Sequence, residues 1–189
     1  CNVAVGKDSL KENTTADNNT AIGVLALGAN TTGSTNVAIG RKTMCTNTTG
    51  ANNTAIGNQS LEQNTTADNN TAVGNASLDA NTTGAGNTAL GQSSLGSNTT
   101  ASDNTAVGHQ ALFTNVTGAN NVAVGKNALY YNTASTNTAI GNLAMTNTST
   151  GAGNTAVGQN ALTANTTGTE NVAIGKNALD ANTEGGYSV

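Results

Sequence analysis

The stretch NTAIGVLALGANTTGST, residues 19–35, decides the fold of this chain, because close copies of it follow one another along the sequence. Its first five residues fit the pattern Asn-(Thr/Val)-Ala-(Ile/Val/Leu)-Gly, which begins eleven times, the first time at Asn2. The copies are spaced by 17 residues, except for a spacing of 16 between Asn121 and Asn137. Such a regular internal period is typical of repeat architectures.

The repeats cover residues 2–187, so we expect a single domain over residues 1–189. Seventeen residues are too few for a helical-hairpin repeat, which needs about 33. Positions one to five of the unit alternate in side-chain character with a period of two, which predicts a β-strand. We expect a second short strand at positions seven to ten and a return turn at Asn-Thr-Thr-Gly. The predicted fold class is all-β: a single-stranded parallel β-solenoid, or β-roll, of eleven 17-residue coils.

Stacking explains how a chain with few large apolar residues can fold. One coil has too small a core to be stable alone, but coils in register build continuous columns of like side chains. We expect position four (Ile, Val or Leu) and position nine (Leu or Met) to face the interior. The predicted core columns include Ile22, Leu27, Ile39, Met44, Ile56, Leu61, Val73, Leu78, Leu90, Leu95, Val107 and Leu112.

Two further positions do not vary among the eleven copies. Position three is always Ala, which faces either a flat outer surface or an interior too thin for anything larger, and the sequence leaves both open. Position one is always Asn, and most copies also have Asn at position twelve. We expect these Asn side chains to form hydrogen-bonded ladders along the stack, as amides do in other stacked β structures.

Composition argues against several classes of function. Only 8% of residues are charged, and the six basic residues are scattered, so we expect no nucleic-acid surface. No apolar run approaches the ~20 residues of a membrane span, so we expect no membrane insertion. His109 is the only histidine and has no nucleophile or carboxylate spaced to act with it, so we expect no enzyme activity and no cofactor. Asp17, Asp68 and Asp103 lie in turns that lack the dense acidic pattern of a calcium-binding repeat.

Nine of the turns contain an Asn-x-Ser/Thr sequon, the acceptor for N-linked glycans. The candidate acceptors are Asn13, Asn30, Asn47, Asn64, Asn81, Asn98, Asn115, Asn147 and Asn165. Sequons also arise by accident here, because Asn-Thr-Thr-Gly is favourable turn chemistry. A glycan-decorated, self-assembling extracellular filament is therefore one alternative function. An ice-binding solenoid, using the recurrent Thr residues, is another.

The pentapeptide, as in residues 19–23 and 121–125, resembles the head repeats of YadA-like trimeric autotransporter adhesins. The full unit is similar to the N-T-A-x-G-x-x-A-L-x-x-N-T-T-G repeats of bacterial and phage tail-fibre-type proteins, over essentially the whole chain. This resemblance implies a left-handed, commonly trimeric β-roll that projects from a cell or virion surface. We therefore expect a segment of a longer extracellular fibre with a structural and adhesive role. Its expected partners are further copies of the chain, as a homotrimer or an end-to-end filament, and a host-surface or glycan ligand.

Overall fold

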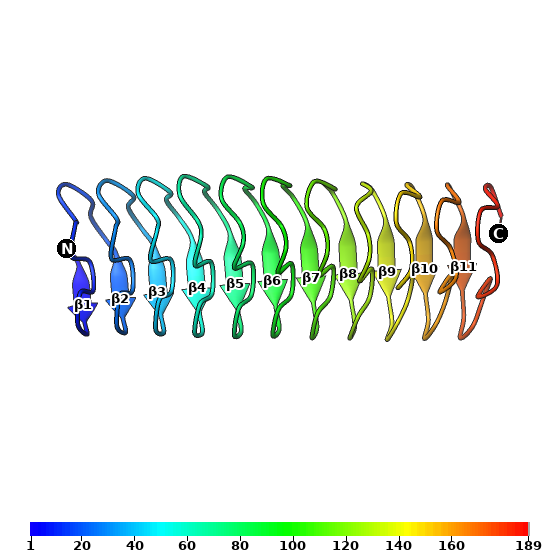
Figure 1. The fold of residues 1–189 in the computed structure, drawn as a ribbon, viewed down its shortest axis with the longest axis horizontal. Coiled ribbons are helices and arrows are strands. Elements are labelled where there is room, and N and C mark those ends of the chain that lie inside the picture. Colours follow the sequence, from blue (N-terminus) through cyan, green and yellow to red (C-terminus); the bar gives the residue numbers. More distant parts are fainter. Residues whose placement is uncertain (189) are drawn as a thin grey trace.

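The computed structural model describes residues 1–188 and confirms the parallel β-solenoid (Figure 1). Each repeat forms one coil with one three-residue strand, and the described residues contain no helix. Each strand pairs only with its neighbours in the sequence, so the sheet order is β1 to β11. The strands are β1 (Val3–Val5), β2 (Thr20–Ile22), β3 (Val37–Ile39), β4 (Thr54–Ile56), β5 (Thr71–Val73), β6 (Thr88–Leu90), β7 (Thr105–Val107), β8 (Val122–Val124), β9 (Thr138–Ile140), β10 (Thr155–Val157) and β11 (Val172–Ile174).

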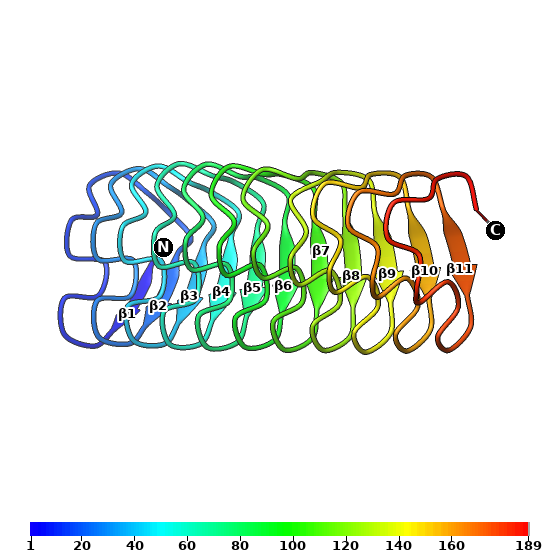
Figure 2. The same cartoon turned by 45° about the vertical axis from the view of Figure 1, so that its right-hand side comes forward.

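Equivalent positions of successive coils lie directly above one another. Ala55 pairs with Ala72, and Ala72 pairs with Ala89, so every column of the rod holds one position of the repeat. Figure 2 shows the strands side by side as one wall, with turns completing the rest of each coil. At a strand spacing of about 4.8 Å, eleven strands give a rod about 50 Å long.

The middle residue of each strand faces the interior, and its two neighbours face outward, because successive side chains of a strand point to opposite faces. In β4, Ala55 is fully buried, whereas Thr54 is half-buried and Ile56 is exposed. This settles the choice left open for Ala: it lines a thin interior. The predicted core column at position four is therefore wrong. Its predicted members all lie on the outside of the coil: Ile22, Ile39, Ile56, Val73, Leu90 and Val107.

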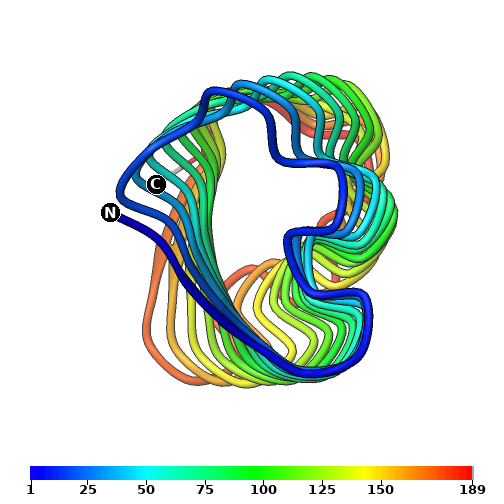
Figure 3. The ribbon, with the colours of Figure 1, turned by 90° about the vertical axis from the view of Figure 1, so that its left-hand side faces the viewer.

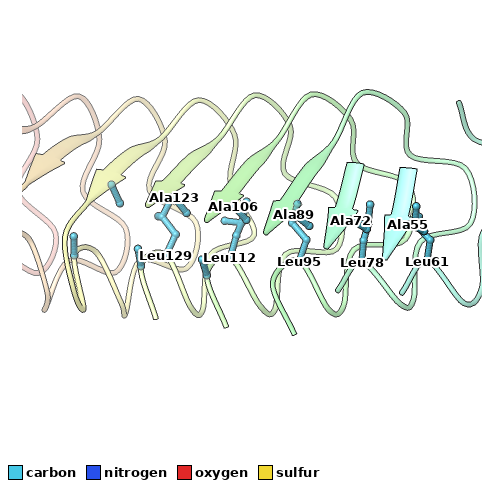
Figure 4. Packing of buried hydrophobic residues seen from close by; sticks show 14 of the residues in the cluster. Ala55, Leu61, Ala72, Leu78, Ala89, Leu95, Ala106, Leu112, Ala123 and Leu129 are labelled. Atoms are coloured by element: carbon cyan, nitrogen blue, oxygen red, sulfur yellow. The ribbon is translucent and has the colours of Figure 1, made fainter. Parts of the chain in front are cut away.

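The expected column at position nine is confirmed. Its predicted members Leu27, Met44, Leu61, Leu78, Leu95 and Leu112 are all fully buried. Figure 4 shows the Leu and the strand Ala of each coil pointing toward one another, for example Leu95 and Ala89. The interior is therefore about one large side chain thick. Because an inward Ile at position four would need the same space as the Leu, the large strand residues are directed outward.

The expected second strand at positions seven to ten is not formed. Positions seven and nine have positive φ angles instead, as in Gln59 (58°) and Leu61 (51°), and the segment is a turn. Left-handed backbone costs a non-glycine residue about 1–2 kcal/mol, so the local sequence gives little sign of it. The turn still pairs with the neighbouring coils: the Leu61 amide donates to the Ser77 carbonyl at 3.0 Å. Stacking thus maintains a backbone that the residues would not adopt alone.

The two expected Asn ladders are present. At position one, the backbone N–H of Asn53 donates to Asn36 Oδ1 at 2.9 Å, and the backbone N–H of Asn70 donates to Asn53 Oδ1 at 2.9 Å. At position twelve, Asn64 Nδ2 donates to Asn47 Oδ1 at 2.8 Å. The Ala67 carbonyl accepts from both Asn53 Nδ2 (2.9 Å) and Asn64 Nδ2 (3.1 Å), which ties the strand of the coil to its return turn.

We predict that Leu95→Ala and Leu90→Ala differ strongly in their effect on stability. Leu95 is fully buried, and its truncation leaves a cavity in a core with few other large residues, so the free energy of unfolding should fall by about 2–5 kcal/mol. Leu90 lies in the same coil but is 46% exposed, so its truncation should cost the isolated chain much less. Urea unfolding of the two variants as monomers tests this, and equal losses would contradict the assigned orientation of the strands.

Position five requires glycine for two separate reasons, which three Gly→Ala variants distinguish. Gly91 has a φ of +137°, and a Cβ there would lie 2.6 Å from the Gly108 carbonyl oxygen of the next coil. Gly175 has a similar φ, +125°, but no atom within 4 Å of that Cβ; Gly28, at position ten, has no positive φ, and its Cβ would come no closer than 3.3 Å to another heavy atom. We expect Gly91→Ala to cost about 3 kcal/mol or more, Gly175→Ala about 1–2 kcal/mol and Gly28→Ala less. Thermal unfolding measures this order, and equal costs for Gly91→Ala and Gly175→Ala would show that local backbone preference alone matters.

Candidate functional site

The outer face of the sheet carries two columns of side chains along the whole rod. Position four contributes an aliphatic column, which continues from the residues already described through Val124, Ile140, Val157 and Ile174. Several of these residues are exposed, with 41% for Ile140 and 72% for Ile174. Position two contributes a parallel column of Thr and Val. We call these two columns the strand face.

The strand face has no charged residue, because every side chain at positions two and four is Thr, Val, Ile or Leu. Soluble monomers rarely leave an apolar surface uncovered over such a length. The described part of the chain contains no pocket that could hold a small molecule. The extended strand face is therefore the main candidate for a functional surface.

On the side of the rod formed by positions seven and ten, the type of side chain differs from coil to coil. Lys42 Nζ lies 3.2 Å from Glu62 Oε1, and Gln59 Nε2 donates to Glu62 Oε2 at 2.6 Å. Cys45 is half-buried beside them, and desolvation, with the nearby Glu62 charge, raises the pKa of its thiol. Asp79 follows in the next coil, and desolvation raises the pKa of its carboxyl. Cys45, Glu62 and Asp79 lie in one row because position ten of each coil stacks on position ten of the next.

The same row continues into a group of aromatic rings. Phe113 and Tyr130 stack with ring centroids 5.3 Å apart and an interplanar angle of 26°. Tyr131 meets Tyr130 edge-on, with centroids 4.6 Å apart. Tyr131 is 53% exposed, and the other two rings are partly exposed. We call Phe113, Tyr130 and Tyr131 the aromatic patch.

Most of the predicted glycan acceptors are inaccessible. Seven of the nine side chains are fully buried in the position-twelve ladder: Asn30, Asn47, Asn64, Asn81, Asn98, Asn115 and Asn165. A glycan is attached through Nδ2, and this atom already donates to the turn carbonyl, as in Asn30 to Gly33 at 2.9 Å. Asn13 makes the same bond at 3.2 Å and is half-buried. Asn147 is exposed, because the neighbouring Thr148 takes the interior place in its coil.

His109 lies exposed at position six. Among residues 1–188, no three His, Cys, Asp or Glu side chains are grouped to hold a metal ion. The same residues contain no helix long and apolar enough to cross a membrane. Comparison with protein-family models, curated proteins and solved structures gives no match.

Sequence reasoning missed both surfaces for physical reasons. The strand face was assigned to the core because large aliphatic residues are usually buried. The signal against this was position three, whose strict Ala indicates a tighter environment than that of the variable Thr/Val and Ile/Val/Leu beside it. The aromatic patch joins residues of two coils, Phe113 with Tyr130 and Tyr131, and only the 17-residue stacking brings them together.

We expect Asp79→Asn to raise stability at neutral pH. The raised pKa means that the folded chain binds this proton more tightly than the unfolded chain. The resulting stabilisation is complete below the ordinary pKa of Asp and is lost as the pH rises through the folded pKa. Removal of the charge should therefore raise the midpoint of thermal unfolding at pH 7 and change it less at pH 3.

Asp103→Asn is the matched control, since it removes the same charge from an exposed turn. Circular dichroism melts at the two pH values measure both variants. An Asp79→Asn melt at pH 7 that is unchanged, or changed only as much as the Asp103→Asn melt, would contradict the desolvation of this carboxyl.

Proposed function

We propose that this chain is a non-catalytic structural and adhesive segment of an extracellular or virion-surface fibre. The observation that carries the proposal is the uncharged strand face, which runs the length of a rigid rod. A rod in which every layer is bonded to the next suits a spacer that must keep its length. The similarity of the repeat to trimeric adhesin heads and tail-fibre repeats supports the same role.

The partner that fits the strand face best is another copy of the same chain. A partner that covers the whole face must present complementary side chains at the same spacing of about 4.8 Å over eleven layers. A second rod has this spacing, and the side chains of its own strand face are equally free of charge. Association through this face would remove the aliphatic column from water, which is the main driving force of protein association. We propose a homotrimer, in keeping with the resemblance.

A double variant, Val73→Lys/Leu90→Lys, tests this assembly. Both residues lie on the strand face, so each copy would bring two charges into the contact between rods. We expect the wild type to sediment with three times the 18.5 kDa chain mass and the variant to sediment as a monomer. Circular dichroism of both proteins verifies that the coils remain folded.

The matched control is Asn75→Lys/Gln92→Lys, which adds the same charges in the same coils at exposed position six. Other coils already have Lys there, as in Lys7 and Lys126. The control should remain associated. A monomeric wild type at about 100 μM, well above the Kd of a stable assembly, would refute the proposed assembly, and dissociation of the control would show that the effect is not specific to the strand face.

Ice binding is a second candidate, because the outward Thr residues stand in a regular column on the sheet. The column contains Thr20, Thr54, Thr71, Thr88, Thr105, Thr138 and Thr155, interrupted by Val3, Val37, Val122 and Val172. A strand face that binds ice would have to be free of other rods. Thermal hysteresis measured together with the sedimentation mass therefore separates the two candidates.

A further inference from the structure

The aromatic patch gathers three of the four aromatic residues of the chain. The coil can form its turn without these aromatic rings. The position occupied by Phe113 and Tyr130 holds Gly96 in the coil before and Thr146 in the coil after, and both of those coils have the same turn. The phenol of Tyr131 stands 53% exposed at the edge of the group. Rings that fold stability does not demand, and that remain open to solvent, indicate a contact surface.

A buried side-chain oxygen without a donor lies in the same turn as Tyr130. Asn127 is at position seven of the coil that contains Tyr130, and positions seven and ten are neighbours, as the 2.6 Å Gln59–Glu62 hydrogen bond shows in another coil. The backbone carbonyl of Asn127 accepts from Thr146 Oγ1 at 3.2 Å, whereas its Oδ1 is buried and has no donor. A buried acceptor without a donor is costly, so this amide gains from a ligand hydroxyl when it turns toward one.

The surroundings of the aromatic patch are almost free of charge. Residues 104–153 contain one charged side chain, Lys126, and no carboxylate. A basic peptide would find no carboxylate here, and an acidic peptide would find a single lysine. Such surroundings suit a ligand with a flat apolar side, which can lie on an aromatic ring, and with many neutral hydroxyl groups, which can bond to tyrosine hydroxyls and a side-chain amide.

We propose that the aromatic patch binds a neutral saccharide, with a pyranose ring lying against Tyr131 and Tyr130. The C–H groups on one face of a pyranose ring meet the electron-rich face of an aromatic ring. The sugar hydroxyls would bond to the tyrosine hydroxyls and to the Asn127 amide. This inference rests on the proposed adhesive function and supplies its ligand class.

Saccharide binding is compatible with assembly through the strand face. Figure 3, a view along the rod, shows the strands on one side of each coil and the indented turn that follows them on the other. The patch residues belong to that turn, at positions ten and eleven. A trimer joined through its strand faces would therefore present three copies of the patch outward, and multivalency would strengthen weak individual contacts.

The test is titration of the full chain with neutral oligosaccharides of known composition: cellotetraose, maltotetraose, chitotetraose, mannotetraose and β1,4-galactotetraose. The chain has no Trp, so its tyrosine fluorescence reports on three Tyr residues, two of them in the patch. Calorimetry gives the affinity. We expect at least one of these sugars to bind, and Tyr131→Ala to weaken it by roughly 10-fold, a typical effect of removing a central aromatic contact.

Tyr187→Ala is the matched control, because Tyr187 is 77% exposed and lies outside the patch. It should bind like the wild type, and both variants should melt within a few degrees of it. The proposal is overturned if no sugar of the panel binds at about 10 mM, well above the ~1 mM Kd of even a weak contact, or if Tyr131→Ala binds normally. Peptides that bind in a Tyr131-dependent way, without any sugar binding, would instead assign the patch to a protein. The sedimentation mass is independent of these results, so a failed sugar test leaves the assembly intact.

Discussion

The structure depends on a buried amide whose oxygen is satisfied by the backbone of a neighbouring layer stacked in register. Asn36, Asn53 and Asn70 are almost completely buried, and each oxygen accepts from the backbone of the coil that follows. A buried polar group without partners costs several kcal/mol. A coil shifted along the chain by one residue would leave these amides unpaired. The ladder therefore fixes the register of the stack. The thin core of Ala and Leu would specify this register only weakly by itself.

Because the Asn ladder fixes the register, the large aliphatic residues of the strands are not needed in the core and can lie on the surface. The interior needs only the position-nine Leu or Met, small residues and paired amides to fill it. Each fully buried Leu contributes about 2 kcal/mol, and the hydrogen bonds between layers make the contribution directional. Ile, Val and Leu at position four are thus not required inside. Their presence on the outer face is the observation on which the proposed association of rods rests.

Much of the fold could be predicted because the same residue types recur at fixed positions of the repeat. The 17-residue period, the strand at Thr54–Ile56, the buried Leu61 and the Asn ladders all follow from which residue types recur at which spacing. The direction of the strand side chains did not follow, since hydrophobicity favoured Ile56 over Ala55 for the interior. The left-handed turn at Gln59 and Leu61 was also missed, because its stability comes from neighbouring coils and not from local preference.

The shortened coil that begins at Asn121 and the coil after it show which of the two ladders the fold can lose. The position-twelve ladder is interrupted where Thr148 replaces Asn, and the buried Thr148 Oγ1 has no partner. The position-one ladder passes this point intact, with Asn137 and Asn154 donating at 2.9 Å. An unpaired hydroxyl costs about 1–3 kcal/mol, which a rod of many additive layers can absorb. The return turns can therefore change length and composition while the strands cannot, and it is beside such an altered turn that the aromatic patch lies.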